Sequence, residues 1–107
     1  MAKFEIYTDK RGEFRFRLKA GNGQTILASE GYKTKSSCLN GVESVKKNSQ
    51  DSTRFETLEA KNGKFHFNLK ATNGQVIGTS QMYKTTRSMK NGILSVSKNA
   101  PKADLVE

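Results

Sequence analysis

The residues that most often perform catalysis or bind metals are scarce in this sequence. His66 is the only histidine and Cys38 the only cysteine among 107 residues. A general base needs a partner and a pocket, and a reactive thiol needs a nearby base or cation. Neither residue has such a partner at a recognisable spacing, and no phosphate-binding loop or zinc-ligand spacing is present. The sequence therefore predicts a non-enzymatic protein without a catalytic, cofactor or metal site.

Positive charge is the next feature that can support a function. The chain has 19 lysines and arginines against 10 acidic residues, which gives a formal net charge of +9. Such an excess favours nucleic acid or another polyanion as a partner. Solubility alone accounts for it equally well, because the basic residues are scattered and no run of five marks a binding arm.

Some of these basic residues fall on one face of a predicted sheet. Residues 14–19 alternate apolar and basic side chains, which predicts a strand with a basic outer face. Residues 4–8 predict a preceding strand, and Lys10-Arg11-Gly12 suits a three-residue hairpin loop. That loop places Arg17 opposite Glu5. In the second half of the chain, the same register places His66 opposite Leu58 on the outer face, where we expect it to be exposed and idle.

This outer face is the first candidate binding surface. Its residues are Tyr7, Arg15, Arg17, Lys19, His66 and Lys70. A basic sheet face with an exposed aromatic ring can bind single-stranded nucleic acid through phosphate contacts and stacking. The alternative is a solvated face, on which Glu5 neutralises Arg17 and Glu56 lies beside Asn68. Only one aromatic residue is available there, and the second half is less basic, so the solvated face is favoured.

An internal repeat organises the chain. Phe4-Glu5 recurs as Phe55-Glu56, 51 positions later, and the same shift aligns most of the remaining sequence without a gap. One more step of this length reaches Val106-Glu107. We therefore predict one domain, 1–107, with repeats at about 4–50 and 55–101 and a closing strand at about 103–107.

Each repeat predicts three strands and a helix. The turns at Asn22-Gly23 and Asn73-Gly74 lead into a third strand, whose register depends on whether the loop has two or three residues. Thr34 or Ser36 can cap the first helix and Thr85 the second. The apolar stripe of the first helix carries Cys38, Gly41, Val42 and Val45, and Met89, Gly92, Ile93 and Val96 repeat it. A glycine in mid-helix in both repeats suggests that each helix presses closely on the sheet.

A second candidate site recurs between the third strand and the helix. Its residues are Tyr32, Lys33, Tyr83 and Lys84. The two tyrosines can form a symmetric pair that flanks a groove. The favoured interpretation is structural, with each ring covering the start of a helix and each hydroxyl bonded locally.

The repeated pattern resembles the YegP-like family of small uncharacterised bacterial proteins. The resemblance rests on Phe-x-Phe-x-Leu-Lys-Ala at residues 14–20 and 65–71, on the Asn-Gly-Gln turns and on Ser-Gln-Met-Tyr at 80–83. It also rests on Asn-Gly-x-x-Ser-Val before each helix end, and it covers about Phe4 to Val106. The family implies an α+β fold of tandem β(3)-α-β repeats. In it, a single antiparallel sheet has swapped C-terminal strands, and two helices pack on one face. It implies no functional residue.

These observations predict a cytoplasmic binding protein that acts without catalysis, with a protein or small ligand as its unidentified partner. The alternative is a weak, sequence-independent nucleic-acid binder that uses the basic outer face. The single cysteine and the absence of a signal-like or membrane-spanning apolar run favour the cytoplasm. We expect a monomer with internal pseudo-twofold symmetry.

Overall fold

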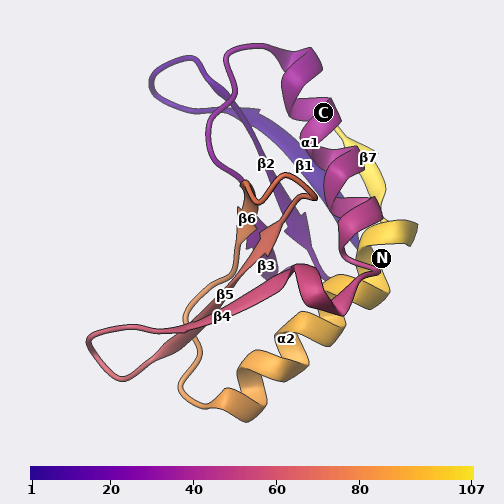
Figure 1. Cartoon of the computed structure of the whole chain (residues 1–107). Coiled ribbons are helices and arrows are strands. Elements are labelled where there is room, and N and C mark those ends of the chain that lie inside the picture. Colours follow the sequence, from indigo (N-terminus) through magenta and orange to yellow (C-terminus); the bar gives the residue numbers. More distant parts are fainter.

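The computed structural model describes residues 1–107 as two successive three-strand-and-helix units with a closing strand (Figure 1). The first unit comprises β1 (Lys3–Thr8), β2 (Phe14–Lys19), β3 (Thr25–Ala28) and α1 (Lys35–Asn48). The second comprises β4 (Phe55–Glu59), β5 (Phe65–Lys70), β6 (Val76–Thr79) and α2 (Thr86–Asn99). The closing strand is β7 (Asp104–Val106). Short 3-10 turns, η1 (Ser52–Arg54) and η2 (Ala100–Lys102), follow the helices.

The seven strands form one sheet in the order β4-β5-β6-β3-β2-β1-β7. The predicted strand exchange is present, since β4 follows α1 but pairs with β5, and β7 follows α2 but pairs with β1. The prediction of a fully antiparallel sheet is wrong for β7, which runs parallel to β1. The pseudo-twofold axis between β3 and β6 explains this direction. The axis relates α1 to α2 and β4 to β1. The strand that follows α2 must therefore have the direction of β1, just as the strand that follows α1 has the direction of β4.

The hairpins have the expected registers. Arg17 pairs with Glu5, and His66 pairs with Leu58. Each hairpin turns through a three-residue loop that ends in a glycine with positive φ, such as Gly12 at 80° and Gly23 at 85°. In β3 a bulge at Ile26 lets both Ile26 and Leu27 face the interior, which settles the register that the sequence left open.

Both helices cover the same face of the sheet, and one hydrophobic cluster draws on both repeats (Figure 1). Phe4 and Phe16 are fully buried in it together with Phe67. Thr34 and Thr85 cap the helices, each accepting a hydrogen bond from a backbone amide three residues on. Neither helix is long and apolar enough to cross a lipid bilayer.

The mid-helix glycines are explained by a close approach of tyrosine rings. The Tyr32 ring stacks on Phe16, and a Cβ atom built on Gly41 would lie 2.5 Å from the Tyr32 hydroxyl oxygen. The second repeat is equivalent: a Cβ on Gly92 would lie 2.2 Å from the Tyr83 hydroxyl oxygen. The predicted close packing of each helix is therefore confirmed, with the tyrosine ring as its cause.

Candidate functional site

The outer face of the sheet, opposite the helices, carries a continuous row of paired residues across six strands. From β4 to β1 the row reads Glu56, Asn68, Thr79, Ala28, Arg17 and Glu5. Its centre is the Ala28–Thr79 pair at the pseudo-twofold axis. Small side chains therefore occupy the middle of this face, and longer polar side chains stand toward both ends.

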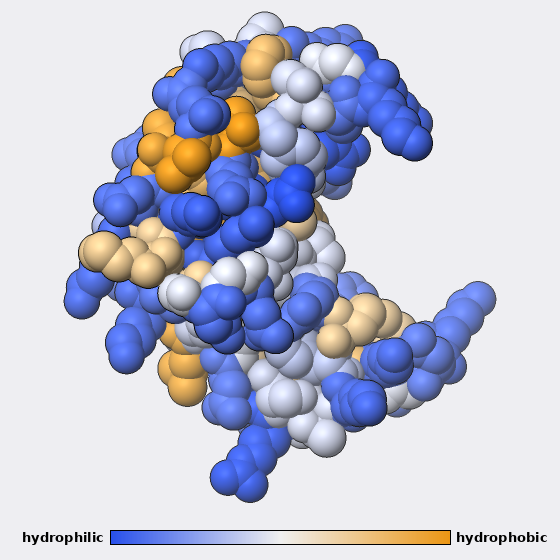
Figure 2. Space-filling view, turned by 180° about the vertical axis from the view of Figure 1, so that it is seen from behind, coloured by the Kyte–Doolittle hydropathy of each residue, from blue (hydrophilic) through white to orange (hydrophobic).

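This face is hollowed. The β1–β2 and β4–β5 loops extend away from the helices in Figure 1, and the view from behind in Figure 2 shows a deep notch between two projecting hydrophilic arms. We call residues 9–13 the first arm, residues 60–64 the second arm and the space between them the outer hollow. The strands β3 and β6 lie between the two hairpins in the sheet and form its floor.

In the first repeat, carboxylates engage the basic residues of the candidate face. Arg15 Nε donates to Asp9 Oδ2 at 2.8 Å, and Lys19 Nζ lies 3.1 Å from Glu5 Oε1. Glu5 also lies 3.8 Å from Arg17 Nε, and the Arg17 guanidinium covers the Tyr7 ring at 4.0 Å from its centroid. The hydrogen bond from Lys19 holds the pKa of Glu5 below its ordinary value, and that from Arg15 lowers the pKa of Asp9.

The second repeat shows a similar but weaker network. Lys70 Nζ donates to Glu56 Oε2 at 3.0 Å, which is the main cause of the lowered pKa of Glu56. Asn68 donates to the same carboxylate and accepts from the Thr79 hydroxyl. His66 is half-buried rather than exposed, because it is flanked by neighbouring strands, and its Nδ1 atom has no hydrogen-bond partner. The imidazole is therefore not oriented by a carboxylate in the manner of a catalytic base.

Unpaired positive charge lies on the arms and in the loops that follow β3 and β6, and not on the floor of the outer hollow. Six exposed cations there have no carboxylate within 4.0 Å: Lys10 and Arg11 on the first arm, Lys61 and Lys64 on the second, and Lys33 and Lys84 in the loops that follow β3 and β6. The first arm also carries Asp9 and Glu13, whereas residues 60–64 contain no acid. The second arm is thus the more positive. The alternating pattern of the strands did not reveal it, because these lysines lie in loops.

The second candidate site, with Tyr32, Lys33, Tyr83 and Lys84, does not form a groove. Each tyrosine ring stacks on the core phenylalanine of its own repeat, Tyr32 on Phe16 and Tyr83 on Phe67. Burial raises the pKa of Tyr32, and neither hydroxyl makes a hydrogen bond within the chain. Lys33 and Lys84 are exposed beside them. The structure therefore places these tyrosines, which are partly buried, against the core and beside the middle of the helices, and not at the helix starts.

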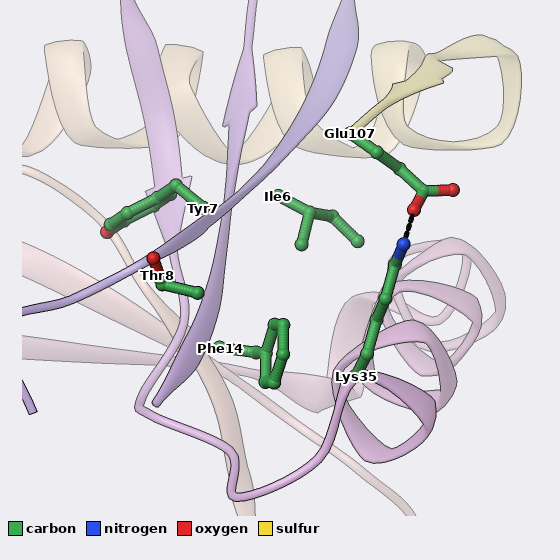
Figure 3. A pocket seen from close by; sticks show the side chains of 6 residues that line it. All are labelled: Ile6, Tyr7, Thr8, Phe14, Lys35 and Glu107. Carbon is green, nitrogen blue, oxygen red and sulfur yellow. Dashed lines mark ion pairs between the residues drawn. The ribbon is translucent and has the colours of Figure 1, made fainter. Parts of the chain in front are cut away.

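The structure contains one cavity, of about 270 Å³ and open to solvent, which sequence reasoning missed (Figure 3). Ile6 and Phe14 point into it, and the ion pair between Lys35 and Glu107 closes one side. Thr8 lies on the rim, and Tyr7 points away. Lys35 and Glu107 stand at opposite ends of the sequence, so no local pattern could have predicted that they meet.

The remaining chemically versatile residue, Cys38, is buried on the inner face of α1, where burial raises the pKa of its thiol. A raised pKa reduces the fraction of reactive thiolate. No group of three or more histidine, cysteine or acidic side chains is placed to hold a metal ion.

Comparison with known proteins places the chain in a family. The profile described as "Domain of unknown function (DUF1508)" matches twice, at residues 9–56 and 60–107, so the two matches start 51 positions apart. The "UPF0339 protein in ptx operon 5'region" of Stutzerimonas stutzeri is 64% identical over 97% of this chain and 94% of its own length. The UPF0339 protein YegP of Escherichia coli K12 is 53% identical over 90% of this chain and 87% of its own length.

Solved structures agree with the fold. The solution NMR structure of yegP from E. coli, described as a protein of unknown function, has a TM-score of 0.93 at 48% identity. The match covers 98% of this chain and 90% of the E. coli chain. The UPF0339 protein SO3888 of Shewanella oneidensis also has a TM-score of 0.93, at 47% identity, with coverages of 98% and 89%. The chain therefore belongs to the DUF1508 family of two-repeat α+β proteins, which includes the UPF0339 proteins and YegP.

Proposed function

We propose that this protein is a non-enzymatic binding protein whose partner is an acidic protein segment held in the outer hollow. The observation that carries the proposal is the combination of a concave face with unpaired cations on its arms (Figure 2). Exposed cations that no internal carboxylate engages are available to a partner and raise its association rate. The second arm, with Lys61 and Lys64, is expected to make the strongest contacts.

The composition of the outer face favours a protein over single-stranded nucleic acid. Nucleic-acid platforms of this kind stack bases on exposed aromatic rings. Here one face of the only candidate ring, Tyr7, is covered by Arg17. Sequence-independent nucleic-acid binding therefore remains the second candidate, supported by the free cations alone.

The proposal includes a cytoplasmic location. Its support is the single cysteine, Cys38, which is buried and has no partner for a disulfide. Proteins of oxidising compartments usually use their cysteines in disulfides.

Two charge variants of equal net charge test the proposal. The first, K61E/K64E/K84E, reverses free cations beside the outer hollow, and the second, K47E/K98E/K102E, reverses exposed cations near the ends of the helices. Poly-glutamate, oligo-dT and oligo-rU are titrated into each ¹⁵N-labelled protein, and amide shifts are recorded at low and moderate salt. We expect poly-glutamate to shift the second arm and β6, and only the first variant to lose this binding.

Two outcomes would contradict the proposal. Equal loss of binding in both variants would mean that only net charge matters. Salt-dependent binding of the oligonucleotides, with no binding of poly-glutamate, would establish the second candidate function instead. In that case K61E/K64E/K84E should also lose oligonucleotide binding, because Arg15, Arg17 and Lys19 are already engaged by carboxylates.

A further inference from the structure

The cavity beside β1 has an apolar wall and a single cation. Ile6, Thr8 and Phe14 project from the same inner face of β1 and β2, and Ile6 and Phe14 are half-buried (Figure 3). The first turn of α1 is polar and exposed, and its apolar stripe starts only at Cys38. The helix therefore leaves Ile6 and Phe14 without an apolar cover.

The ion pair that closes this cavity is easily opened. The Lys35 and Glu107 side chains are 49% and 46% exposed, and half-exposed pairs of this kind contribute little to stability. Glu107 follows β7, a strand of three residues that are all exposed. A ligand that offers its own carboxylate can therefore take the place of Glu107 on the Lys35 ammonium group without disturbing the core.

The second repeat provides an internal comparison. Ile6 corresponds there to Thr57 and Lys35 to Thr86, and no strand lies beside β4 in the position of β7. The apolar wall, the cation and the covering carboxylate are thus all absent from the equivalent place, and no cavity forms there. The fold itself does not require these features, because the second repeat folds in the same way without them.

We infer that this cavity binds a small monocarboxylate with an apolar body, and that Glu107 competes with the ligand for Lys35. The Lys35 ammonium group would bind the carboxylate, the Thr8 hydroxyl can donate a further hydrogen bond, and the hydrocarbon part would lie against Ile6 and Phe14. The volume of about 270 Å³ is slightly below the range of drug-sized sites, which limits the ligand to a few carbon atoms. This site lies on the helix side of β1 and is independent of the outer hollow.

The test uses isocaproate, its neutral amide isocaproamide and the zwitterion leucine as probes. Each is titrated into the ¹⁵N-labelled full chain, and amide shifts are followed at Ile6, Thr8, Lys35 and Glu107. Thr57, Phe65 and Thr86 in the second repeat serve as the internal control. We expect saturable shifts with isocaproate at the first set only, and none with the amide.

Two variants decide the role of each charge. Lys35→Met keeps the length of the side chain but removes its charge, and should weaken isocaproate binding by about tenfold or more. Glu107→Gln removes the competing carboxylate and should tighten binding by about two- to threefold. If E107Q binds the probes more weakly than the wild type and leucine binds better than isocaproate, Glu107 does not compete with the ligand. It would then bind the amino group of a zwitterion, and the competition would be overturned. Equal shifts from acid and amide, or no saturable shift with isocaproate, would overturn the site itself.

Discussion

Replacing Gly92 by alanine tests the packing that joins each helix to the sheet. Alanine is the best helix-forming residue and is favoured over glycine in a helix interior by about 0.8–1.0 kcal/mol. On helix propensity alone, Gly92→Ala should therefore stabilise the protein. In the structure the new Cβ would lie 2.2 Å from the hydroxyl oxygen and 2.6 Å from Cζ of Tyr83. Both distances are far below van der Waals contact, so the ring or the helix must move.

The cost of that movement decides whether Gly92→Ala stabilises or destabilises the protein. The Tyr83 ring is held against Phe67, with 6.2 Å between ring centroids and 14° between ring planes, so it cannot simply swing away. Overpacking a close-packed site costs about 1–3 kcal/mol. Subtracting the gain of about 1 kcal/mol in helix propensity leaves a net loss of up to about 2 kcal/mol. We expect Gly41→Ala to have the same sign and a smaller effect, because its closest contact, with Tyr32, is 2.5 Å.

Urea denaturation followed by far-ultraviolet circular dichroism measures the free energy of unfolding, and suits a chain without tryptophan. Asn91→Ala, at an exposed neighbouring position, controls for helix propensity and should stabilise by about 0.5 kcal/mol. In a Tyr83→Leu background, which lacks the two atoms nearest the new Cβ, G92A should become stabilising by up to about 1 kcal/mol. If G92A stabilises the wild-type protein as N91A does, the tyrosine contact does not explain the glycine and the reasoning fails.

Three further predictions concern the same architecture. The pKa values of Glu5, Asp9 and Glu56 are lowered in the folded state. The ionised carboxylates therefore stabilise the folded protein fully above their ordinary pKa of about 4, and this contribution is lost as the pH falls through the lower pKa values of the folded state. The urea midpoint should therefore drop between pH 6 and pH 3, and it should drop less in E5Q/E56Q; an unchanged slope would contradict the assignment. Thr85→Ala should cost about 1 kcal/mol of unfolding free energy by removing the cap of α2, whereas Thr86→Ala next to it should not. A Cβ on Gly78 would lie 2.7 Å from the Leu27 side chain, so G78A should lower the stability of the protein. Thermal melts should show that the double variant L27A/G78A loses less stability than the sum of the losses in the two single variants.

Much of this fold follows from short-range sequence signals. The three-residue loop that ends in Gly12 sets the register of the first hairpin, so the pairing of Arg17 with Glu5 was predictable, whereas the Asn-Gly turns left the register of the third strand of each repeat open. The cap of the second helix at Thr85 follows from side-chain chemistry at a single position, whereas the sequence left Thr34 and Ser36 as alternatives for the first helix. These features depend on residues close together in the chain, and each occurs twice. An inference from one repeat can therefore be compared with the equivalent residues of the other.

The features that the sequence did not predict depend on long-range geometry. Val106-Glu107 aligns as a third copy of Phe4-Glu5. These two residue types do not indicate that β7 runs parallel to β1. That direction follows from the pseudo-twofold axis, which exists only once β3 and β6 have paired. The cavity depends in turn on β7, because it brings Glu107 to Lys35. The outer hollow depends on the curvature of the whole sheet, to which the bulges at Ile26 and Ile77 add local twist.

The two repeats share the ring packing of their cores and differ on the outer face, where we propose that a partner binds. Phe16 and Tyr32 recur unchanged as Phe67 and Tyr83, because the helix, ring and strand must fit together in both halves. On the outer face, by contrast, Arg17 stands where the other repeat has Asn68. The partner that we propose for the outer hollow would therefore meet two unlike halves, one with internally paired charges and one with a freer, positive arm. A twofold-symmetric ligand could not satisfy both, so we expect the bound partner to be asymmetric and to shift the amides of the second arm more than those of the first.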